Sequence, residues 1–240
     1  MKKLPIVFLL LFTLQGFAQD VRSVCGRINQ LNSDILPGLV KPADAAKQFK
    51  TLVADLKTQI GKTSSPWPAN RAWVFPLQGY KPAAIGGTNG NGYSDKGYSY
   101  LDGNKHGAHP AHDIFINDKN QDSQDDRTQQ PVNVLAVDDG IVIACSNDWE
   151  PNSTLRGGKF IWIYHPAADI FTYYAHNQAI FVKPGDYIKQ GTKIAEVGRT
   201  GLNAYKKRSP THLHFSSFKL VNDLPVPFNS YTQLKKAVSK

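Results

Sequence analysis

The sequence predicts a β-rich fold, mainly an antiparallel β-sheet domain, with a small N-terminal helical hairpin in front of it. Short runs of β-branched and aromatic residues follow one another after about residue 67, separated by Asp-Gly, Pro-Gly or single glycines. No helix-length periodic segment interrupts them, whereas before residue 61 apolar residues recur at helical spacing. With 240 residues and 41% hydrophobic content, the chain can bury one full core and a small appendage.

The first eighteen residues have the pattern of a signal peptide. Lys2 and Lys3 give a positive start, residues 6–14 are apolar, and residues 16–18 form a small-x-small cleavage signal. The apolar run is shorter than the ~20 residues that a membrane span needs. We therefore expect residues 1–18 to be removed and the mature protein to be exported, periplasmic or extracellular, without a membrane span.

The charge of the chain suits an anionic partner. Removal of two lysines and no acid lowers the formal net charge from +9 to +7. A basic exported protein fits a cell wall or membrane surface, although the charge serves solubility equally well. Because the sequence has no long Lys/Arg tract and no aromatic-basic interleaving, we expect no nucleic-acid partner. We expect a monomer.

Cys25 and Cys145 are the two cysteines of the chain. Export permits a disulfide between them, which would close a long loop. The alternative is two separate thiols, with Cys145 packed on its strand. The sequence leaves the choice open.

Two helices are expected before the sheet, in a segment covering residues 19–63. Residues 21–31 carry apolar side chains at helical spacing. The second helix begins near Pro42, where a first-turn proline is tolerated, and ends at Gly61. Its apolar stripe consists of Phe49, Leu52, Val53, Leu56 and Ile60. Such a hairpin cannot fold alone, so we expect it to pack on the following domain through a linker at residues 64–68.

The following domain is expected to span residues 64–222, with a C-terminal tail at 223–240. The predicted strands lie within residues 132–146, 160–164, 171–176, 188, 193–197 and 212–220. Residues 85–107 form a long irregular stretch rich in glycine and tyrosine, of the kind that borders a site. Residues 231–240 are expected to form a short basic helix or to fray.

Two histidines near the C-terminus indicate the position of a candidate active site. His212 and His214 are two apart on a predicted strand, so their side chains share one face. About a hundred residues upstream, His109 and Asp113 add an imidazole and a carboxylate. Together with one ring of the pair they give two histidines and one carboxylate with a fourth position open, the layout of a catalytic zinc site. A straight strand would hold His109 and Asp113 ~13 Å apart, so the chain must turn, and Pro110 makes a turn plausible.

These pieces resemble a known family. The sequence has an H-x-x-x-D motif at residues 109–113, a Tyr-Ala-His block ending at His176, and an H-x-H motif at residues 212–214. Between the last two blocks lie a Val-Lys-Pro-Gly-Asp turn at residues 182–186 and Val-Gly-Arg-Thr-Gly at residues 197–201. Over residues 75–220 this order resembles the LytM/lysostaphin-type zinc metallopeptidases, which have a duplicated hybrid motif.

The resemblance implies roles for five residues. His109, Asp113 and His214 would hold one Zn²⁺. His176 and His212 would be the catalytic histidines that handle the attacking water and the developing oxyanion. No glutamate adjoins a histidine ligand, as it does in H-E-x-x-H enzymes, so histidines must carry the acid-base chemistry.

The sequence departs from the family pattern at two places. Pro210-Thr211 stands where the family has Gly-Pro before its H-L-H, and Ala111-His112 replaces a glycine and an aliphatic residue. Neither change touches an expected ligand, but both put substrate choice in doubt. His106 and His112 are rivals to His109 as ligand. His165 is most simply a surface residue at a strand end.

The resemblance implies an exported zinc metalloendopeptidase that hydrolyses peptide cross-links of bacterial peptidoglycan. Two alternatives remain: a non-catalytic LytM-like module that binds or activates other wall hydrolases, and a secreted protease acting on glycine-rich proteins. The scissile bond stays open. Whether the enzyme is latent stays open too. The N-terminal helices or residues 85–107 would inhibit it if they covered the cleft. Asn104 or His106 would then occupy the open coordination position of the metal.

A second metal is a weaker expectation. Oxygen-bearing side chains at Asp118, Asn120, Asp122 and Asp126 partly match the spacing of a calcium loop. Ser123 stands where such a loop needs glycine, and Gln129 where it needs a bidentate glutamate. We favour a solvated acidic turn. Bound Ca²⁺ would brace the strand that carries Asp113.

Overall fold

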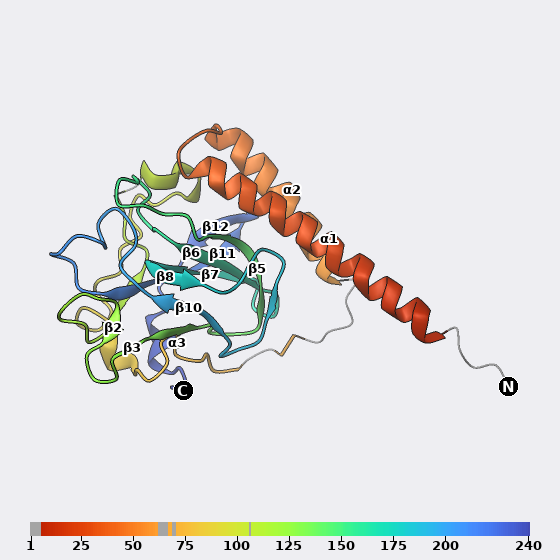
Figure 1. Cartoon of the computed structure of the whole chain (residues 1–240). Helices are drawn as coiled ribbons and strands as arrows, with labels where there is room; N and C mark the ends of the chain where they lie inside the picture. Colours follow the sequence, from red (N-terminus) through yellow and green to blue (C-terminus); the bar gives the residue numbers. More distant parts are fainter. Residues whose placement is uncertain (1–5, 62–66, 69–70, 106) are drawn as a thin grey trace.

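The computed structural model describes residues 6–61, 67–68, 71–105 and 107–240, with side chains from residue 20 onward. A large antiparallel sheet lies against a small one, and two long helices cross the outer face of the large sheet (Figure 1). The predicted fold class, a β-rich domain with an N-terminal helical hairpin, is confirmed.

The large sheet has the strand order β1-β11-β7-β6-β5-β9, and β12 pairs with the far end of β11. Its strands are β1 (His112–Phe115), β5 (Gly140–Ser146), β6 (Phe160–His165), β7 (Ile170–Ala175), β9 (Tyr187–Ile188), β11 (His212–Val221) and β12 (Leu224–Pro227). The small sheet has the order β4-β10-β8, with β4 (Asn133–Leu135), β8 (Asn177–Ile180) and β10 (Lys193–Val197). A further pair joins β2 (Gln124–Asp125) to β3 (Gln130–Pro131). The single run predicted at residues 132–146 is two strands in different sheets, β4 and β5.

Side-chain alternation along the strands divides the core into two clusters. On β6, Ile161 and Ile163 face the small sheet, whereas Phe160, Trp162 and Tyr164 face outward. The outward cluster is covered by the helical hairpin and the inward one by the small sheet. The large sheet is therefore buried on both faces, which explains why its strands are almost continuously apolar.

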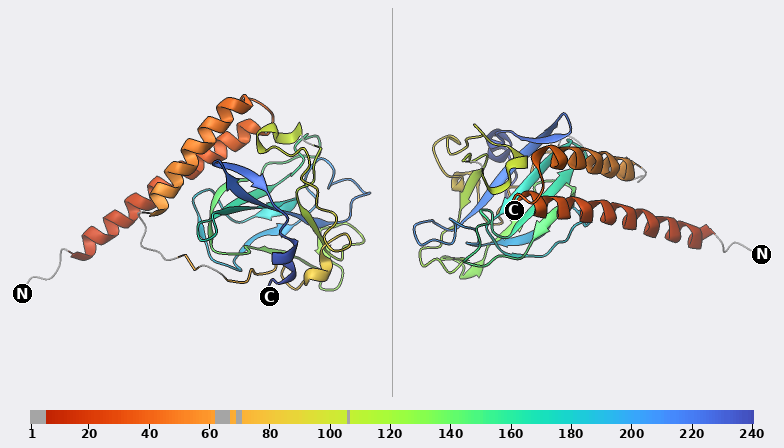
Figure 2. Two further views of the ribbon diagram at one scale, coloured as in Figure 1. Left: turned by 180° about the vertical axis from the view of Figure 1, so that it is seen from behind. Right: turned by 90° about the horizontal axis from the view of Figure 1, so that it is seen from above.

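The hairpin consists of α1 (Ile6–Ile35) and α2 (Pro42–Gly61), which lie together along one face of the sheet (Figure 2). The predicted stripe on α2 is buried, as are Val21, Val24, Ile28 and Leu31 on α1. The Asn29 side chain also accepts a hydrogen bond from the Cys145 backbone at 2.9 Å. The expectation that the hairpin packs on the domain is confirmed.

Helix α1 begins earlier than the predicted run at residues 21–31, because residues 6–18 continue it as helix. Removal of residues 1–18 stays a prediction. No described helix has both the length and the apolar character to cross a membrane. Residues 64–66 of the expected linker lie outside the described residues.

The structure decides between the two alternatives for the cysteines and corrects the expectation for His165. Cys25 and Cys145 are free thiols, and burial raises the pKa of Cys25 to about 12 and that of Cys145 to about 11. The expectation that His165 lies on the surface is wrong, since the residue is 1% exposed. Its ring contacts the Asp139 carbonyl at 2.9 Å and the Thr172 hydroxyl at 2.7 Å, so a polar network explains its burial.

Short elements complete the domain. They are the 3₁₀ turns η1 (Pro82–Ala84) and η2 (Tyr100–Lys105) and the helix α3 (Tyr231–Lys235). The last residues pack on the domain, because Leu234 is fully buried and Val238 forms a parallel bridge with Val74. The short C-terminal helix was one of the two expectations for this segment.

Candidate active site

Strand register brings the predicted residues of the site together. Asp113 on β1 lies directly opposite His214 on β11, and His214 lies opposite Ala175 on β7, one residue before His176. Paired residues on neighbouring strands point to the same face. His212 shares that face with His214, while Leu213 between them is fully buried in the inner core. The site therefore stands on the outer face of the large sheet, beside the helical hairpin.

His109 reaches Asp113 because the chain turns before β1 begins. The Ala111 backbone donates a hydrogen bond to the His109 carbonyl at 2.8 Å, which closes a tight turn around Pro110. The His109 ring then lies 3.2 Å from the Asp113 carboxylate, measured from Nε2 to Oδ1. The turn expected from the H-x-x-x-D spacing is present.

His109, Asp113 and His214 form a cluster that fits a metal ion. One donor atom from each lies within 4.8 Å of the others. The Asp113 Oδ1 atom is 3.2 Å both from His109 Nε2 and from His214 Nδ1. Tetrahedral ligands ~2.1 Å from an ion are separated by ~3.4 Å, close to these distances. Among the described residues this is the one group of three or more His, Cys, Asp or Glu side chains that could hold a metal ion.

Backbone carbonyls fix the tautomers of three rings. The Nδ1 atoms of His109, His176 and His212 lie 2.9, 2.7 and 2.7 Å from the carbonyls of Gly92, Thr200 and Pro210, respectively. A carbonyl can only accept, so each Nδ1 carries the proton and each Nε2 keeps its lone pair. His214 is reversed, because Nδ1 faces Asp113 and Nε2 lies 3.5 Å from the Ser216 hydroxyl. When neutral, the rings of His109, His176 and His212 therefore carry the lone pair on Nε2, and the Asp113 carboxylate accepts hydrogen bonds from His109 and His214 when the facing nitrogens are protonated.

His176 and His212 stand beside the cluster. Their ring centroids are 4.9 Å apart, and the His176 ring is 5.4 Å from that of His214. The backbone of His176 has φ 67°, in the left-handed region that non-glycine residues rarely adopt. Its N–H donates to the Gly157 carbonyl at 2.9 Å, which holds this conformation. A strained backbone conformation that neighbouring contacts hold in place is typical of functional sites.

Burial and neighbours set the protonation of the site. Burial alone would raise the pKa of Asp113, but hydrogen bonds from His109 and His214 hold it below its usual range. Burial lowers the pKa of His176 and of His214. The hydrogen bond to Asp113 raises the pKa of His109. An ionised carboxylate and neutral imidazoles are the forms that ligate metals, so binding an ion would release the proton that His109 holds at low pH.

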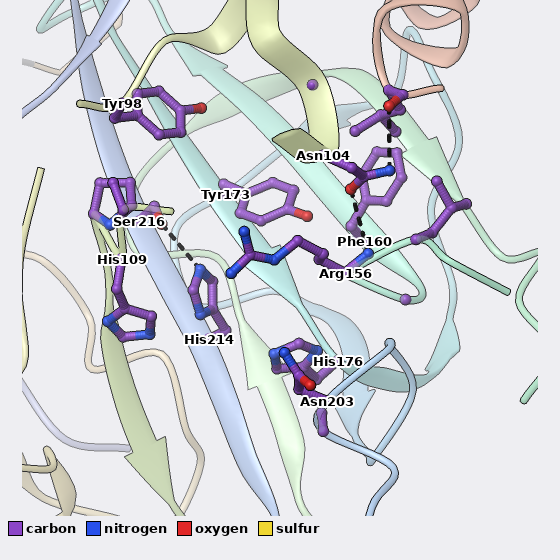
Figure 3. A pocket seen from close by; sticks show the side chains of 18 of the residues that line it. Tyr98, Asn104, His109, Arg156, Phe160, Tyr173, His176, Asn203, His214 and Ser216 are labelled. Carbon is purple, nitrogen blue, oxygen red and sulfur yellow. Dashed lines mark hydrogen bonds between the residues drawn. The ribbon is translucent and has the colours of Figure 1, made fainter. Parts of the chain in front are cut away.

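A cavity of about 270 Å³ extends from these residues toward the end of α1 (Figure 3). Its far walls are aromatic, formed by Tyr98, Tyr100, Phe160, Trp162, Tyr173 and Phe218. Tyr98 and Tyr100 belong to the glycine-tyrosine stretch that was expected to border a site. The others, and Arg156, carry no signal in the sequence, because only the pairing of strands and loops brings them here.

His112 and Asn104, the described alternatives at the metal site, lie away from the cluster. His112 points away from the cluster, with Nε2 3.0 Å from the Asn229 side chain and its ring stacked on Tyr93. The Asn104 amide donates to the Leu36 carbonyl at 3.2 Å and accepts from the Arg156 backbone, on the opposite side of the cavity (Figure 3). Asn104 therefore does not cap the cluster, and His106 lies outside the described residues.

The acidic loop after β1 uses its oxygens internally. The Asp118 carboxylate accepts hydrogen bonds from the backbones of Asp122 and Ser123 and, at 2.6 Å, from the Thr211 hydroxyl. Asp126 accepts from the Lys119 backbone. These hydrogen bonds tie the loop to the start of β11, as in the favoured solvated turn, and the loop geometry gives the alternative of a calcium site no support.

Comparison with known proteins gives a family match for part of the chain. Residues 120–226 match the model of Peptidase family M23, a segment that includes His176, His212 and His214. No curated protein matches the chain in sequence.

Several solved structures are similar to part of the chain. The catalytic domain of lysostaphin from Staphylococcus simulans is 24% identical, with 55% of this chain and 82% of that chain covered and a TM-score of 0.39. A zinc-containing peptidase from Vibrio cholerae is 24% identical over 72% of this chain and 40% of that chain, with a TM-score of 0.37. The catalytic domain of the prophage-encoded M23 protein EnpA from Enterococcus faecalis is 18% identical over 68% and 95%, with a TM-score of 0.36.

These likenesses carry no assignment, and the family match covers less than half of the 240 residues. Residues 120–226 of the chain are thus similar to Peptidase family M23.

Proposed function

We propose that the protein is an exported zinc metalloendopeptidase that hydrolyses peptide cross-links in bacterial peptidoglycan. The observation that carries the proposal is the meeting of His109, Asp113 and His214 around one point, with two further histidines beside them. Two nitrogens and one oxygen with an open fourth position form the donor set of catalytic zinc. Zn²⁺ there would supply Lewis acidity and lower the pKa of water toward neutrality.

The chain supplies the proton transfers through His176 and His212. Each has its Nδ1 proton fixed on a carbonyl, so Nε2 is the atom that accepts a proton from the attacking water. The same nitrogen, once protonated, can donate to the developing oxyanion or to the leaving amine. Because burial lowers the pKa of His176 well below its ordinary value, this ring is neutral and ready to accept at neutral pH.

Peptidoglycan is proposed as the substrate from the family and from the charge of the chain. The formal charge of +7 left after removal of residues 1–18 suits an insoluble anionic wall, and the leader pattern of those residues suits export. A non-catalytic binding module is the weaker alternative, because every ligand position is filled and both proton-handling histidines face the cluster.

The test is digestion of purified peptidoglycan by the mature chain, followed by mass analysis of the released fragments. We expect fragments with zinc present, none after chelation, and recovery when zinc is restored. His212→Ala should lower the rate on the order of 10²–10⁴-fold while zinc content stays at one ion per chain. His112→Gln is the matched control, since it changes a histidine that neighbours the site but points away from it.

Three results would redirect the proposal. Binding to the wall without fragments, at full zinc loading, would make the protein a binding module. Cleavage of glycine-rich proteins but not of peptidoglycan would make it a secreted protease of another kind. Loss of zinc in His212→Ala together with its retention in His214→Ala would reverse the proposed roles of the two histidines.

A further inference from the structure

One buried hydrogen-bond donor in the cavity wall has no partner. Asn32, on the last turn of α1, lines the cavity and is 2% exposed. Its Oδ1 atom accepts a hydrogen bond from the Tyr100 hydroxyl at 3.2 Å, whereas its Nδ2 atom has no partner. Among the described residues that line the cavity, Asn32 alone has a buried side-chain polar atom in this state. Buried donors are rarely left unpaired, so this one indicates a ligand atom that accepts from it.

The partner of this donor must come from the cavity. Asn32 borders one other void, between α1 and the sheet, and that void has no volume that a water molecule could occupy. The cavity, in contrast, has a volume of about 270 Å³ and is also lined by His109, Asp113 and His214. A substrate held at the metal cluster can therefore extend into the cavity toward Asn32.

A continuous row of aromatic rings joins the metal cluster to Asn32. The ring of Tyr173 stands beside His214 (Figure 3), with the two centroids 6.1 Å apart. The Trp162 ring is 4.8 Å from that of Tyr173 and 5.6 Å from that of Tyr100, whose hydroxyl bonds Asn32. Because each ring is held by its neighbours, this wall is formed before a ligand binds, and little entropy is lost on binding.

The end of the cavity at α1 is fixed and uncharged. Asn104 on η2 donates to the Leu36 carbonyl through its backbone at 3.3 Å and its side chain at 3.2 Å. A Cβ on Gly103 would lie only 2.3 Å from the Ile35 carbonyl, so η2 lies directly against the end of the helix. The residues of α1, η2 and the turn after α1 that line the cavity are Asn32, Ile35, Leu36, Tyr100, Gly103 and Asn104. A charged group placed here would lose its water without gaining an opposite charge, so this end suits a neutral acceptor.

The group that fits these walls is a neutral carboxamide on an apolar stem. Its carbonyl oxygen accepts from Asn32 Nδ2, and its flat amide and methylene stem pack on the aromatic rings. We propose that the cavity is a specificity pocket for a substrate residue with a glutamine-like side chain beside the scissile bond, and that Asn32 binds the terminal carbonyl of that side chain. The N-terminal helix then takes part in substrate recognition, although it lies outside the segment that matches the family.

The proposal rests on the proposed function, since it assumes that a peptide is bound at the metal cluster. A binding measurement with simple peptides separates the two. Blocked tripeptides with glycine on both sides carry glutamine, its apolar isostere homoleucine, or glutamate at the centre, each in L and D form. They are titrated by calorimetry into the zinc-loaded His212→Ala variant. We expect one form of the glutamine peptide to bind on the order of 10-fold more tightly than the matching glutamate peptide.

Affinity for the glutamine peptide should depend on the Asn32 amide. Adding Asn32→Leu should weaken the glutamine peptide on the order of 10-fold and leave the homoleucine peptide no weaker. Asn29→Leu is the matched control, because Asn29 lies on the same helix and bonds the Cys145 backbone but does not line the cavity. It should keep all affinities. Melting curves show whether each variant is folded. If Asn32→Leu alone is not, it is combined with Tyr100→Phe, which leaves no unpaired hydroxyl behind.

The outcomes are distinct. Failure of every peptide to bind, or equal binding of the glutamine and glutamate peptides, would overturn the inference. So would an equal loss for all peptides in Asn32→Leu, which would give Asn32 a structural role, or an unchanged affinity for glutamine, which would assign its donor to a water molecule. If recognition holds but the zinc-loaded wild type releases no fragments from peptidoglycan, the pocket stands and the proposed hydrolysis fails. Chelator-sensitive hydrolysis together with any of the overturning results gives the reverse.

Discussion

At the scale of single residues, hydrogen bonds to carbonyls prepare the site before any ligand arrives. Gly92, Thr200 and Pro210 each accept from the Nδ1 atom of a site histidine, which leaves the opposite nitrogens to act. Each acceptor is a backbone oxygen, so backbone conformation orients these histidines. That conformation depends in turn on glycines beside the histidines.

Gly201→Ala should reduce catalysis without removing metal. A Cβ at Gly201 would lie 2.3 Å from the Arg156 carbonyl and 2.8 Å from His176 Nδ1, and the residue has φ +111°. The clash must displace the His176 ring. We expect kcat to fall on the order of 10²-fold with one zinc ion per chain retained, measured by peptidoglycan digestion and metal analysis.

Gly79→Ala is the control for that change. Gly79 also has a positive φ, +75°, so an alanine there is strained too, but its Cβ would have no neighbour within 4 Å. Both variants should melt at lower temperature than the wild type, and only Gly201→Ala should lose kcat. Equal activity of the two variants would show that His176 does not need its present position.

At the scale of elements, the helical hairpin and the active site occupy neighbouring parts of the same face of the large sheet. Trp162, Phe171 and Phe218 belong to the cluster that the helices cover, and Trp162 and Phe218 also line the cavity. The end of α1 contributes Asn32, Ile35 and Leu36 to the cavity wall. The hairpin is therefore a permanent wall of the cleft, which argues against a removable inhibitory segment.

Removal of the hairpin should damage the enzyme rather than activate it. A chain starting at Trp67 would expose the outward cluster, and we expect it to aggregate or to melt well below the intact mature chain. Phe49→Ala tests the same packing more gently, because Phe49 contacts Tyr100 and Phe171 with ring centroids 5.2 and 6.2 Å apart. It should cost about 3–5 kcal/mol in the free energy of unfolding, measured by urea denaturation.

Leu39→Ala provides the comparison for Phe49→Ala. Leu39 lies at the tip of the hairpin and is 77% exposed, so its truncation should leave the free energy of unfolding nearly unchanged. A shortened chain that is folded and has higher specific activity than the intact one would restore the latency hypothesis for the helices.

At the scale of the whole molecule, local patterns predicted most of the helices and strands and the approach of His109, Asp113 and His214. Alternation placed His212 and His214 on one face, and the spacing of His109 and Asp113 required the turn that is present. Long-range packing was not predictable in the same way. The burial of His165 depends on Asp139 and Thr172 from neighbouring strands, and the cavity wall at Arg156 depends on Asn104 and α1.

The central claim is that His109 Nε2, the Asp113 carboxylate and His214 Nδ1 hold one zinc ion. Diffraction from crystals of the zinc-loaded protein, recorded on both sides of the zinc absorption edge, locates the ion directly. We predict one anomalous peak within ~2.0–2.2 Å of those three atoms, with His176 and His212 beside it and no peak in the loop at residues 118–126. A peak coordinated by His176 or His212 in place of His109 or His214, or no peak at the cluster in zinc-saturated crystals, would contradict the account.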